Sequence, residues 1–375
     1  MLKIFQTGDN HIGLKYASHQ QAEVLKSARL NAFERMVDAA NQECCALFVI
    51  TGDLFENTYG ISKREIKTLL DTLSRFNGTV VVLPGNHDYY DKDVKVWQYF
   101  QDVASGKDNI MLLTEYRPYS LTAAGEDIVL YPAHCTSLHS QPGKNNLDWI
   151  KAEEITPDST YKIGLAHGAV QGETIDKEGQ YFLMTRHELE SIPVDAWLVG
   201  HTHVPFPSQL TEDFAVCEKI LNAGTHVQTD VSCNTEGLCF IIEIDEEKIV
   251  RAKKVISGNL RFYRKHIALT PGELEATLHR ELAGIADHSV VDLVLSGAVT
   301  ADEYDNRYSI IESSLARFVE GTYNDNSLSK LISKELIDAE FAETSFSGSL
   351  LTALLDDPKE AQLAYELLQS LKEAK

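Results

Sequence analysis

Short apolar runs alternate with amphipathic stretches along the first two hundred or so residues of the chain. Each run contains at least one β-branched residue, and the runs read LKIFQ, CALFVI, TVVVL, DIVLY, YKIGLA and DAWLV. Such runs are typical of strands buried inside a sheet. Helical periodicity fills three intervals, at about residues 19–42, 62–77 and 91–104, and the second helix opens with a capping box at Ser62 and Glu65. This alternation predicts an α/β domain whose layered strands are covered by helices on both faces.

The pattern changes near residue 260, after further strand-like runs that read KILNAG, GLCFIIEID and KIVRAKKVI. LRFYRKHIAL and SVVDLVLSGAV then predict two strands, each followed by a helix. The first of these helices is expected to start at a capping box formed by Thr270 and Glu273, with Pro271 at its first position. The sequence therefore predicts a main domain over residues 1–259 and a small α/β unit over residues 260–340.

A C-terminal helical segment over residues 341–375 completes the predicted organisation. Its last helix is expected to be capped at Asp357, and it carries an apolar stripe of Leu363, Leu367, Leu368 and Leu371. Such a stripe either packs on the small unit of the same chain or binds a helix of a partner. Both interpretations stay open at this point.

Composition places the chain among ordinary globular proteins. It has 375 residues, which suggests two or three domains, and 43% of them are hydrophobic. We find no apolar run long enough for a membrane span, and MLKIFQTGD enters a strand without a signal-peptide pattern. The six cysteines form no C-x-x-C pair and are expected to be buried hydrophobes. We therefore expect a cytoplasmic protein that does not contact membranes.

The formal net charge of −22 argues against a protein that coats DNA indiscriminately. It does not exclude a phosphodiester substrate, because two divalent metals would add about four positive charges locally. Residues 251–266 break the acidic trend, since they contain six Lys and Arg and no acid. This stretch is either a solvated strand pair at a domain junction or a strip that contacts backbone phosphates.

Five strand ends carry an unusual set of polar side chains. They read TGDNH, TGDLFE, PGNHD, LAHG and VGHTH, and each lies beside a glycine that allows a sharp turn. Because loops at the carboxyl ends of strands converge on one crevice in α/β domains, these side chains can meet. The candidate ligands are Asp9, His11, Asp53, Asn86, His167, His201 and His203.

Four imidazoles with two carboxylates and one amide are too many donors for one metal and suit two. The mixture of nitrogen and hard oxygen favours Mn²⁺, Fe²⁺ or Zn²⁺ over Mg²⁺ or Ca²⁺. Each motif also has a simpler interpretation: Asp9 could cap a helix, and His167 could be a satisfied core residue. All five motifs in this order argue for a two-metal phosphoryl-transfer site.

These motifs resemble the signature of the calcineurin-like metallophosphoesterases, which runs D-x-H, GD, GNH[DE], H and GHxH and spans residues 9–203 here. The resemblance implies a layered β-sandwich flanked by helices, with a small α/β capping domain and C-terminal helices. By resemblance, one metal would be held by Asp9, His11 and His203, the other by Asn86, His167 and His201, and Asp53 would bridge them.

The same resemblance assigns His87 as the general acid on the leaving oxygen, with Asp88 orienting its ring. An imidazole near its pKa can give up a proton at neutral pH, which fits this role independently. After GDLF, the better-known nucleases of this group carry a histidine, whereas this chain has Glu56. That departure leaves the metal ligands intact and puts efficient exonuclease action in doubt.

The full layout resembles DNA repair exonucleases of the SbcD type, and the C-terminal segment resembles their shorter bacterial relatives of the YhaO type. This resemblance implies a DNA substrate, a homodimer and a partner that is an SMC-like coiled-coil ATPase of the SbcC type. The leading hypothesis is therefore a Mn²⁺-dependent nuclease that acts on DNA ends in repair or defence. The alternatives are a phosphoesterase for a small nucleotide and a non-catalytic regulator of an ATPase.

Overall fold

The structure is a computed structural model that describes residues 1–141, 143–155, 158, 160–172, 181–233, 235–342 and 345–373. The chain forms two compact units, Met1–Arg261 and Phe262–Lys375. The second unit contains both the small α/β unit and the C-terminal helices, and a division between them at residue 340 stays a prediction.

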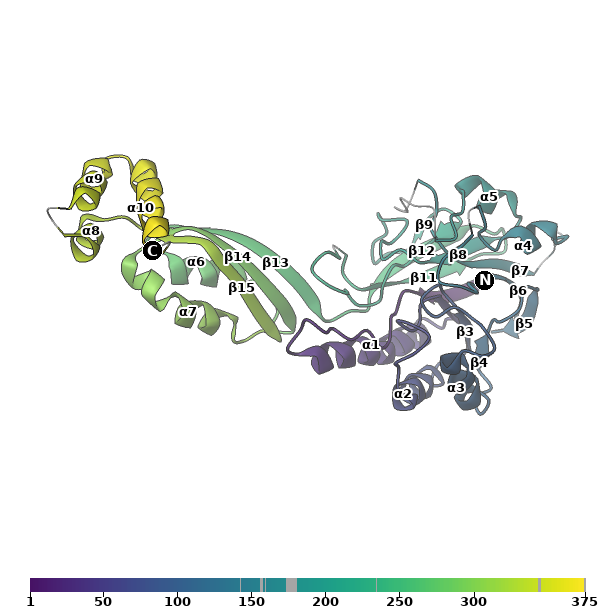
Figure 1. Cartoon of the computed structure of the whole chain (residues 1–375). Helices are drawn as coiled ribbons and strands as arrows, with labels where there is room; N and C mark the ends of the chain where they lie inside the picture. The colour runs from purple at the N-terminus through teal and green to yellow at the C-terminus, as the bar shows by residue number, and fades with distance from the viewer. Residues whose placement is uncertain are drawn as a thin grey trace. The chain divides into compact units, whose positions relative to one another are not determined.

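Two sheets form the centre of the first unit (Figure 1). In the seven-stranded sheet the order is β4 (Ile110–Leu112), β3 (Thr79–Leu83), β2 (Leu47–Thr51), β1 (Leu2–Thr7), β11 (Leu238–Ile244), β12 (Val250–Ile256) and β9 (Ala215–Val216). In the five-stranded sheet it is β10 (Ile220–Leu221), β8 (Ala196–Gly200), β7 (Tyr161–His167), β6 (Glu126–Ala133) and β5 (Tyr119–Ala123). Strands β1 to β4 run parallel, as do β6, β7, β8 and β10.

Successive side chains of the central strands enter different layers of the core. In β2, Leu47 and Val49 face the five-stranded sheet, whereas Phe48 and Ile50 pack under helices. Burial on both faces explains why these strands read as continuous apolar runs rather than as alternating patterns. Helices α1 (Ala22–Gln42), α2 (Lys63–Leu73) and α3 (Lys95–Ala104) cover the seven-stranded sheet, and α4 (Asp148–Ala152) and α5 (Arg186–Ser191) cover the other. The predicted α/β fold class, a β-sandwich flanked by helices, is confirmed.

Helix α2 begins as predicted, because Ser62 and Glu65 form both bonds of a capping box. It ends at Leu73, four residues before the predicted stop at Asn77. Asn77 instead donates its backbone N–H to the side chain of Asn41 on α1. The chain therefore leaves α2 through a turn that is tied to the neighbouring helix.

The second unit holds a three-stranded sheet of β13 (Arg261–Leu269), β14 (Ser289–Val299) and β15 (Glu320–Lys330). Helices α6 (Leu274–Leu282) and α7 (Ala301–Leu315) pack on it. The predicted capping box at Thr270 and Glu273 is wrong. Glu303 of α7 caps α6 instead, by accepting the backbone N–H groups of Gly272 and Leu274 at 2.8 and 2.9 Å.

Helices α8 (Lys334–Glu340), α9 (Phe346–Leu354) and α10 (Pro358–Glu373) share a small core at the end of the chain (Figure 1). The cap at Asp357 is present, since its carboxylate accepts the N–H of Glu360 at 3.2 Å. The predicted stripe divides: Leu368 packs with Tyr365 on this core, whereas Leu363, Leu367 and Leu371 are 57–64% exposed. Within the described ranges, the helices lack the length and apolarity that a membrane crossing requires.

Candidate metal centre

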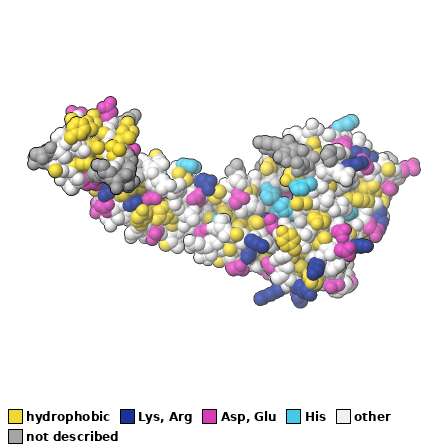
Figure 2. All heavy atoms as spheres, viewed as in Figure 1, with side chains coloured by type: hydrophobic (Ala, Val, Ile, Leu, Met, Phe, Trp, Pro, Cys, Tyr) yellow, Lys and Arg dark blue, Asp and Glu magenta, His cyan; other side chains and the backbone are white. Residues whose placement is uncertain are grey.

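The candidate ligands lie at the carboxyl ends of β1, β2, β3, β7 and β8, as the sequence pattern predicts. Strands β1 to β3 belong to one sheet, and β7 and β8 belong to the other. The two sheets pack face to face, so their strand ends meet at one edge of the sandwich. Figure 2 shows histidine side chains gathered at the surface of the first unit.

Several of these residues have backbone conformations that L-amino acids rarely adopt. The φ angles of Asp9, His11, Asp53 and His201 are 48°, 46°, 49° and 106°. Positive φ values at residues with side chains are costly and persist where the surrounding structure determines them. The turns after β1, β2 and β8 are therefore shaped to aim side chains at a common point.

Two glycines make the close approach of these loops possible. A Cβ atom on Gly85 would lie 2.2 Å from Oδ1 of Asp53, and a Cβ atom on Gly52 would lie 2.0 Å from Nδ1 of His167. Gly52 also has a φ of 96°. Any side chain at these positions would displace a candidate ligand.

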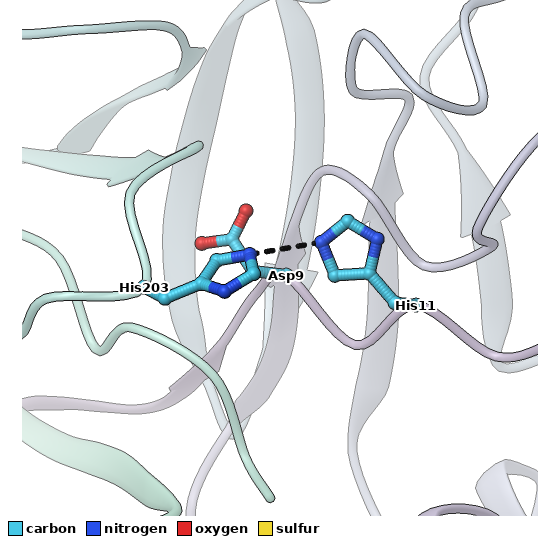
Figure 3. Close-up of side chains that lie close together, drawn as sticks. All are labelled: Asp9, His11 and His203. Carbon is cyan, nitrogen blue, oxygen red and sulfur yellow. Dashed lines mark hydrogen bonds between the residues drawn. The ribbon is translucent and has the colours of Figure 1, made fainter. Parts of the chain in front are cut away.

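Asp9, His11 and His203 form the first of two groups, here named the Asp9 cluster (Figure 3). One ligand atom of each lies within 4.8 Å of the others, and the Nε2 atoms of His11 and His203 are 3.0 Å apart. The carboxylate of Asp9 is fully buried and accepts the backbone N–H of His201 at 2.9 Å. This arrangement of two ring nitrogens and a carboxylate fits a divalent transition metal.

Asn86, His167 and His201 form the second group, here named the Asn86 cluster. Oδ1 of Asn86 lies 3.0 Å from Nε2 of His167 and 3.1 Å from Nδ1 of His201. The other nitrogen of His167, Nδ1, lies 2.8 Å from the backbone carbonyl of Thr51. That contact directs Nε2 of His167 toward the cluster.

Asp53 lies between the two clusters. Its Oδ2 is 3.3 Å from Nε2 of His167 and 3.9 Å from Nε2 of His11. Its Oδ1 accepts the backbone N–H of His87 at 2.8 Å. The seven predicted ligands therefore come together in two groups joined by one carboxylate, which is the arrangement that the resemblance implies; that they bind metal stays a prediction.

The buried ionisable groups of the centre shift one another's pKa values. Burial disfavours ionised Asp53, but the adjacent His167 overcomes this and lowers the pKa of the carboxyl well below its usual range. Burial disfavours the charged form of His167, but the carboxylate of Asp53 outweighs this effect and raises the pKa of His167 to about 9. Burial lowers the pKa of His203 to about 3, so this ring is neutral and has a lone pair to offer.

His87 lies beside both clusters and lines the cavity in front of them. Its ring meets that of His11 edge-on, with the ring centres 4.9 Å apart. Nδ1 of His87 is 3.0 Å from the backbone carbonyl of Glu56. Since a carbonyl can only accept, Nδ1 carries a proton, and Nε2 is the atom that can exchange a proton with a substrate.

Asp88 does not orient the His87 ring, and the expectation that it does is wrong. Its carboxylate is fully buried and accepts the backbone N–H groups of Gly85 and Phe55 at 2.7 and 3.0 Å. Burial, together with the charge of Asp53, raises the pKa of Asp88 to about 7. Asp88 therefore ties the loop after β3 to the loop after β2 and supports His87 only through the backbone.

The model of the calcineurin-like phosphoesterase family matches residues 2–205, which is more than half of the chain. The chain belongs to the calcineurin-like phosphoesterase family. Membership makes it a metal-dependent phosphoester hydrolase, in agreement with the clusters of histidine and aspartate described above.

Three solved structures are similar to this phosphoesterase at low identity. They are the TT1561 protein of Thermus thermophilus (12% identity, 68% of this chain and 99% of that chain, TM-score 0.42), a dimetal phosphatase from Danio rerio (9%, 68% and 98%, 0.38) and a purple acid phosphatase from yellow lupin seeds (13%, 68% and 51%, 0.40). Similarities at this level do not bear on the substrate of this chain.

Arg29 of α1 supports the centre of this phosphoesterase and was missed by the motif analysis. It is 1% exposed, and it donates to the backbone carbonyls of Asn10 at 2.7 Å, Val227 at 2.9 Å and Asp9 at 3.3 Å, and to the hydroxyl of Thr225 at 2.8 Å. Arg29 therefore fixes the backbone of the Asp9 turn from behind. The available sequence signal was an arginine on the buried face of α1, between Leu25 and Phe33.

A cavity of about 710 Å³ opens in front of the two clusters. Its lining includes His11, Asp53, His87, His201 and His203 of the centre. Beyond them it extends over polar and aromatic residues, namely Tyr16, Ser18, His19, Thr229, Asp230 and Ser232. The volume lies in the range of sites for small ligands or for a short stretch of a polymer.

The basic stretch at residues 251–266 is neutralised by acidic neighbours. The pairs are Arg251 with Asp245 (2.7 Å), Lys253 with Glu43 (2.8 Å), Lys254 with Glu236 (3.7 Å), Arg261 with Glu236, Arg264 with Asp292 (2.6 Å) and Lys265 with Glu281 (3.6 Å). All six basic side chains are thus engaged. This favours a solvated strand pair over a strip that contacts phosphates.

Proposed function

We propose that this phosphoesterase is a Mn²⁺-dependent phosphodiesterase that cleaves DNA at its ends and works with an SMC-like coiled-coil ATPase. The observation that carries the proposal is the pair of clusters that share Asp53, with His87 beside them. Two cations held a few ångströms apart suit an in-line displacement at phosphorus. By resemblance, the motifs GNHD and GHTH support the phosphodiesterase and nuclease branch of the family.

Each group of the centre has a distinct role in this reaction. The Asp9 cluster and the Asn86 cluster would each hold one cation, and Asp53 would contact both. When bound, the cations would supply positive charge near the phosphate oxygens and would make a nearby water more acidic. As the P–O bond to the 3′ oxygen breaks, Nε2 of His87 gives that oxygen a proton, while its Nδ1 stays bonded to Glu56.

The direct test is digestion of a DNA oligonucleotide by the purified chain with Mn²⁺. His87→Ala is expected to reduce cleavage by roughly 10²- to 10⁴-fold, because a general acid contributes a factor of that size. Calorimetry should still find two Mn²⁺ per chain in this variant. His187→Ala, an exposed histidine on α5, is the control and should cleave normally. Full activity of His87→Ala would contradict the role of His87.

A small nucleotide substrate is the second candidate, and two observations favour it. The cavity has the size of a small-ligand site, and the only strongly basic stretch of the sequence is already paired with acids. A panel of bis-p-nitrophenyl phosphate, cyclic nucleotides and DNA separates the two candidates. Turnover of a cyclic nucleotide with intact DNA would replace the nuclease proposal.

The exposed leucines of α10 support the proposed ATPase partner. Leu363, Leu367 and Leu371 are spaced by four residues and are exposed on one helix, which suits packing against a coiled-coil helix. Tyr365 and Leu368 of α10 face the core of this chain, so the helix stays folded while the leucines face outward. The alternative that these three leucines pack on their own unit is not favoured.

Replacing Leu363 and Leu371 by Glu should abolish capture of the proposed coiled-coil ATPase and leave thermal stability unchanged. Val216→Glu, at an exposed apolar residue of the first unit, is the matched control and should bind normally. Retained capture by the double variant would rule out docking through α10.

Light scattering of the free chain tests the proposed homodimer. Stimulation of the ATPase without phosphoester turnover would favour the regulator alternative.

A further inference from the structure

Glu56 lies beside the Asp9 cluster because two loops run together as a short parallel ladder. His11 donates its backbone N–H to the carbonyl of Asp53 at 2.9 Å, and Ile12 donates to Leu54 at 2.9 Å. Glu56 then donates its own N–H back to the carbonyl of Ile12 at 3.0 Å. This register brings the side chain of Glu56 alongside the ring of His11.

Glu56 touches two histidines of the centre through different atoms. Its Oε2 lies 2.9 Å from Nδ1 of His11, and its backbone carbonyl lies 3.0 Å from Nδ1 of His87. Its side chain is 26% exposed and lines the cavity. Glu56 is therefore not a solvated loop acid.

We propose that Glu56 is a positioning residue that holds His11 in the tautomer and orientation whose Nε2 can bind a cation. The inference rests on the two-cation centre of the proposed function and does not depend on the identity of the substrate. In this interpretation, the glutamate after the GDLF motif orients a ligand of the Asp9 cluster.

The argument depends on what each atom can donate. Oε2 of Glu56 lies 2.9 Å from Nδ1 of His11 without forming a hydrogen bond. Negative charge at this distance repels a lone pair, so it favours a proton on Nδ1 of His11. The neutral ring then has its lone pair on Nε2, which faces Nε2 of His203 at 3.0 Å inside the Asp9 cluster. A carboxylate behind a ligating imidazole fixes the ring and makes it a stronger ligand.

The test is Mn²⁺ titration of the metal-free full chain by calorimetry, with three variants. Glu56→Ala removes the carboxylate beside His11, and it should weaken one of the two Mn²⁺ sites by roughly tenfold to a hundredfold. Glu56→Gln keeps an acceptor oxygen without the charge, and it should fall between Glu56→Ala and the wild type. Asp230→Asn is the matched control, since it removes a carboxylate from the same cavity that is bonded to Ser232 rather than to a ring.

Nitrogen-15 NMR of the histidine rings is the second readout, because a purely structural role of Glu56 would not move it. In the metal-free wild type, His11 should carry its proton on Nδ1, and this preference should be lost in Glu56→Ala. Glu56→Gln has the same length as the native side chain and keeps the test decisive if Glu56→Ala does not fold.

Wild-type affinity at both sites in Glu56→Ala or Glu56→Gln would overturn the inference, as would a proton on Nε2 of His11. An equal loss in Asp230→Asn would also overturn it, because the effect would then be one of cavity charge. The proposed nuclease function fails separately if the wild type binds two Mn²⁺ but leaves DNA intact.

Discussion

The Asp9 cluster and the Asn86 cluster flank the same carboxylate, but different kinds of groups hold their histidines. In the Asn86 cluster, Nδ1 of His167 faces the backbone carbonyl of Thr51, which is the last residue of β2. In the Asp9 cluster, Nδ1 of His11 faces the side chain of Glu56. The first arrangement is fixed by the sheet, and the second depends on one replaceable side chain. A single substitution can therefore retune one half of the centre and leave the other unchanged.

Asp53→Asn should have the largest effect, because Asp53 is the one group that both clusters share. The variant keeps the shape of the side chain and removes its charge. We expect Mn²⁺ binding to weaken at both sites and hydrolysis of bis-p-nitrophenyl phosphate to fall to background. If calorimetry finds one site unchanged, Asp53 serves only one cluster and the two halves are independent.

Asn86→Ala should abolish Mn²⁺ binding at the Asn86 cluster and leave the Asp9 cluster unchanged. It removes the oxygen that contacts both His167 and His201 and touches no residue of the Asp9 cluster. We expect calorimetry to detect one tight Mn²⁺ per chain instead of two. Loss of both sites would show that the Asp9 cluster requires its neighbour.

Arg29→Met should act on the Asp9 side alone. Without the guanidinium, the buried carbonyls of Asn10 and Val227 lose their donors, and the free energy of unfolding in urea should fall by about 3 kcal/mol. Mn²⁺ affinity should drop at one site, because the Asp9 turn is no longer held. Arg35→Met on the same helix is the control, since Arg35 is only partly buried. If the Mn²⁺ affinities of both sites match those of the wild type, the Asp9 turn keeps its shape without Arg29.

Glu188→Gln should have the smallest effect and should leave the Asn86 cluster intact. Glu188 caps α5, which supports β8 through the bond from the Trp197 indole to the carbonyl of Leu189. Burial opposes the charge, but bonds from Lys151 and Thr185 lower the pKa of Glu188 from 4.5 to about 2. Its stabilisation is therefore present above pH 4.5 and is lost as the pH falls toward 2.

At pH 7, Glu188→Gln should lower the free energy of unfolding in urea by about 1 kcal/mol. The difference from the wild type should shrink below pH 4.5, while two Mn²⁺ still bind at neutral pH. A change in Mn²⁺ affinity would show that helix α5, and not the strand backbone alone, sets the geometry of His201.

The sequence was sufficient to predict that the seven candidate side chains come together, because each follows a buried strand beside a glycine and parallel strand ends meet at one edge. It was insufficient where a contact joins distant segments without a motif. Arg29 sits in an ordinary helical pattern, and the contact between Glu56 and His11 depends on the register of two loops. Asp88 was assigned to the wrong partner because its backbone acceptor role has no sequence pattern.

The second unit shows the same limit. Strand β15 reads EGTYNDNSLSK and was not predicted, because only two of its eleven residues are buried and it lacks an apolar run. Parallel pairing with the buried strand β14 stabilises it instead. Likewise, the cap on α6 comes from Glu303, twenty-nine residues beyond Leu274, and no local pattern near α6 indicates it.

The two crowded glycines limit where the centre can be redesigned. Gly85 and Gly52 admit no side chain without pushing Asp53 or His167 out of place. Substitution at either inner turn would therefore disrupt the centre, whereas position 56 faces the cavity and has room for other side chains. Engineering of a new substrate preference is thus best directed at the rim of the cavity, with the two turns left as they are.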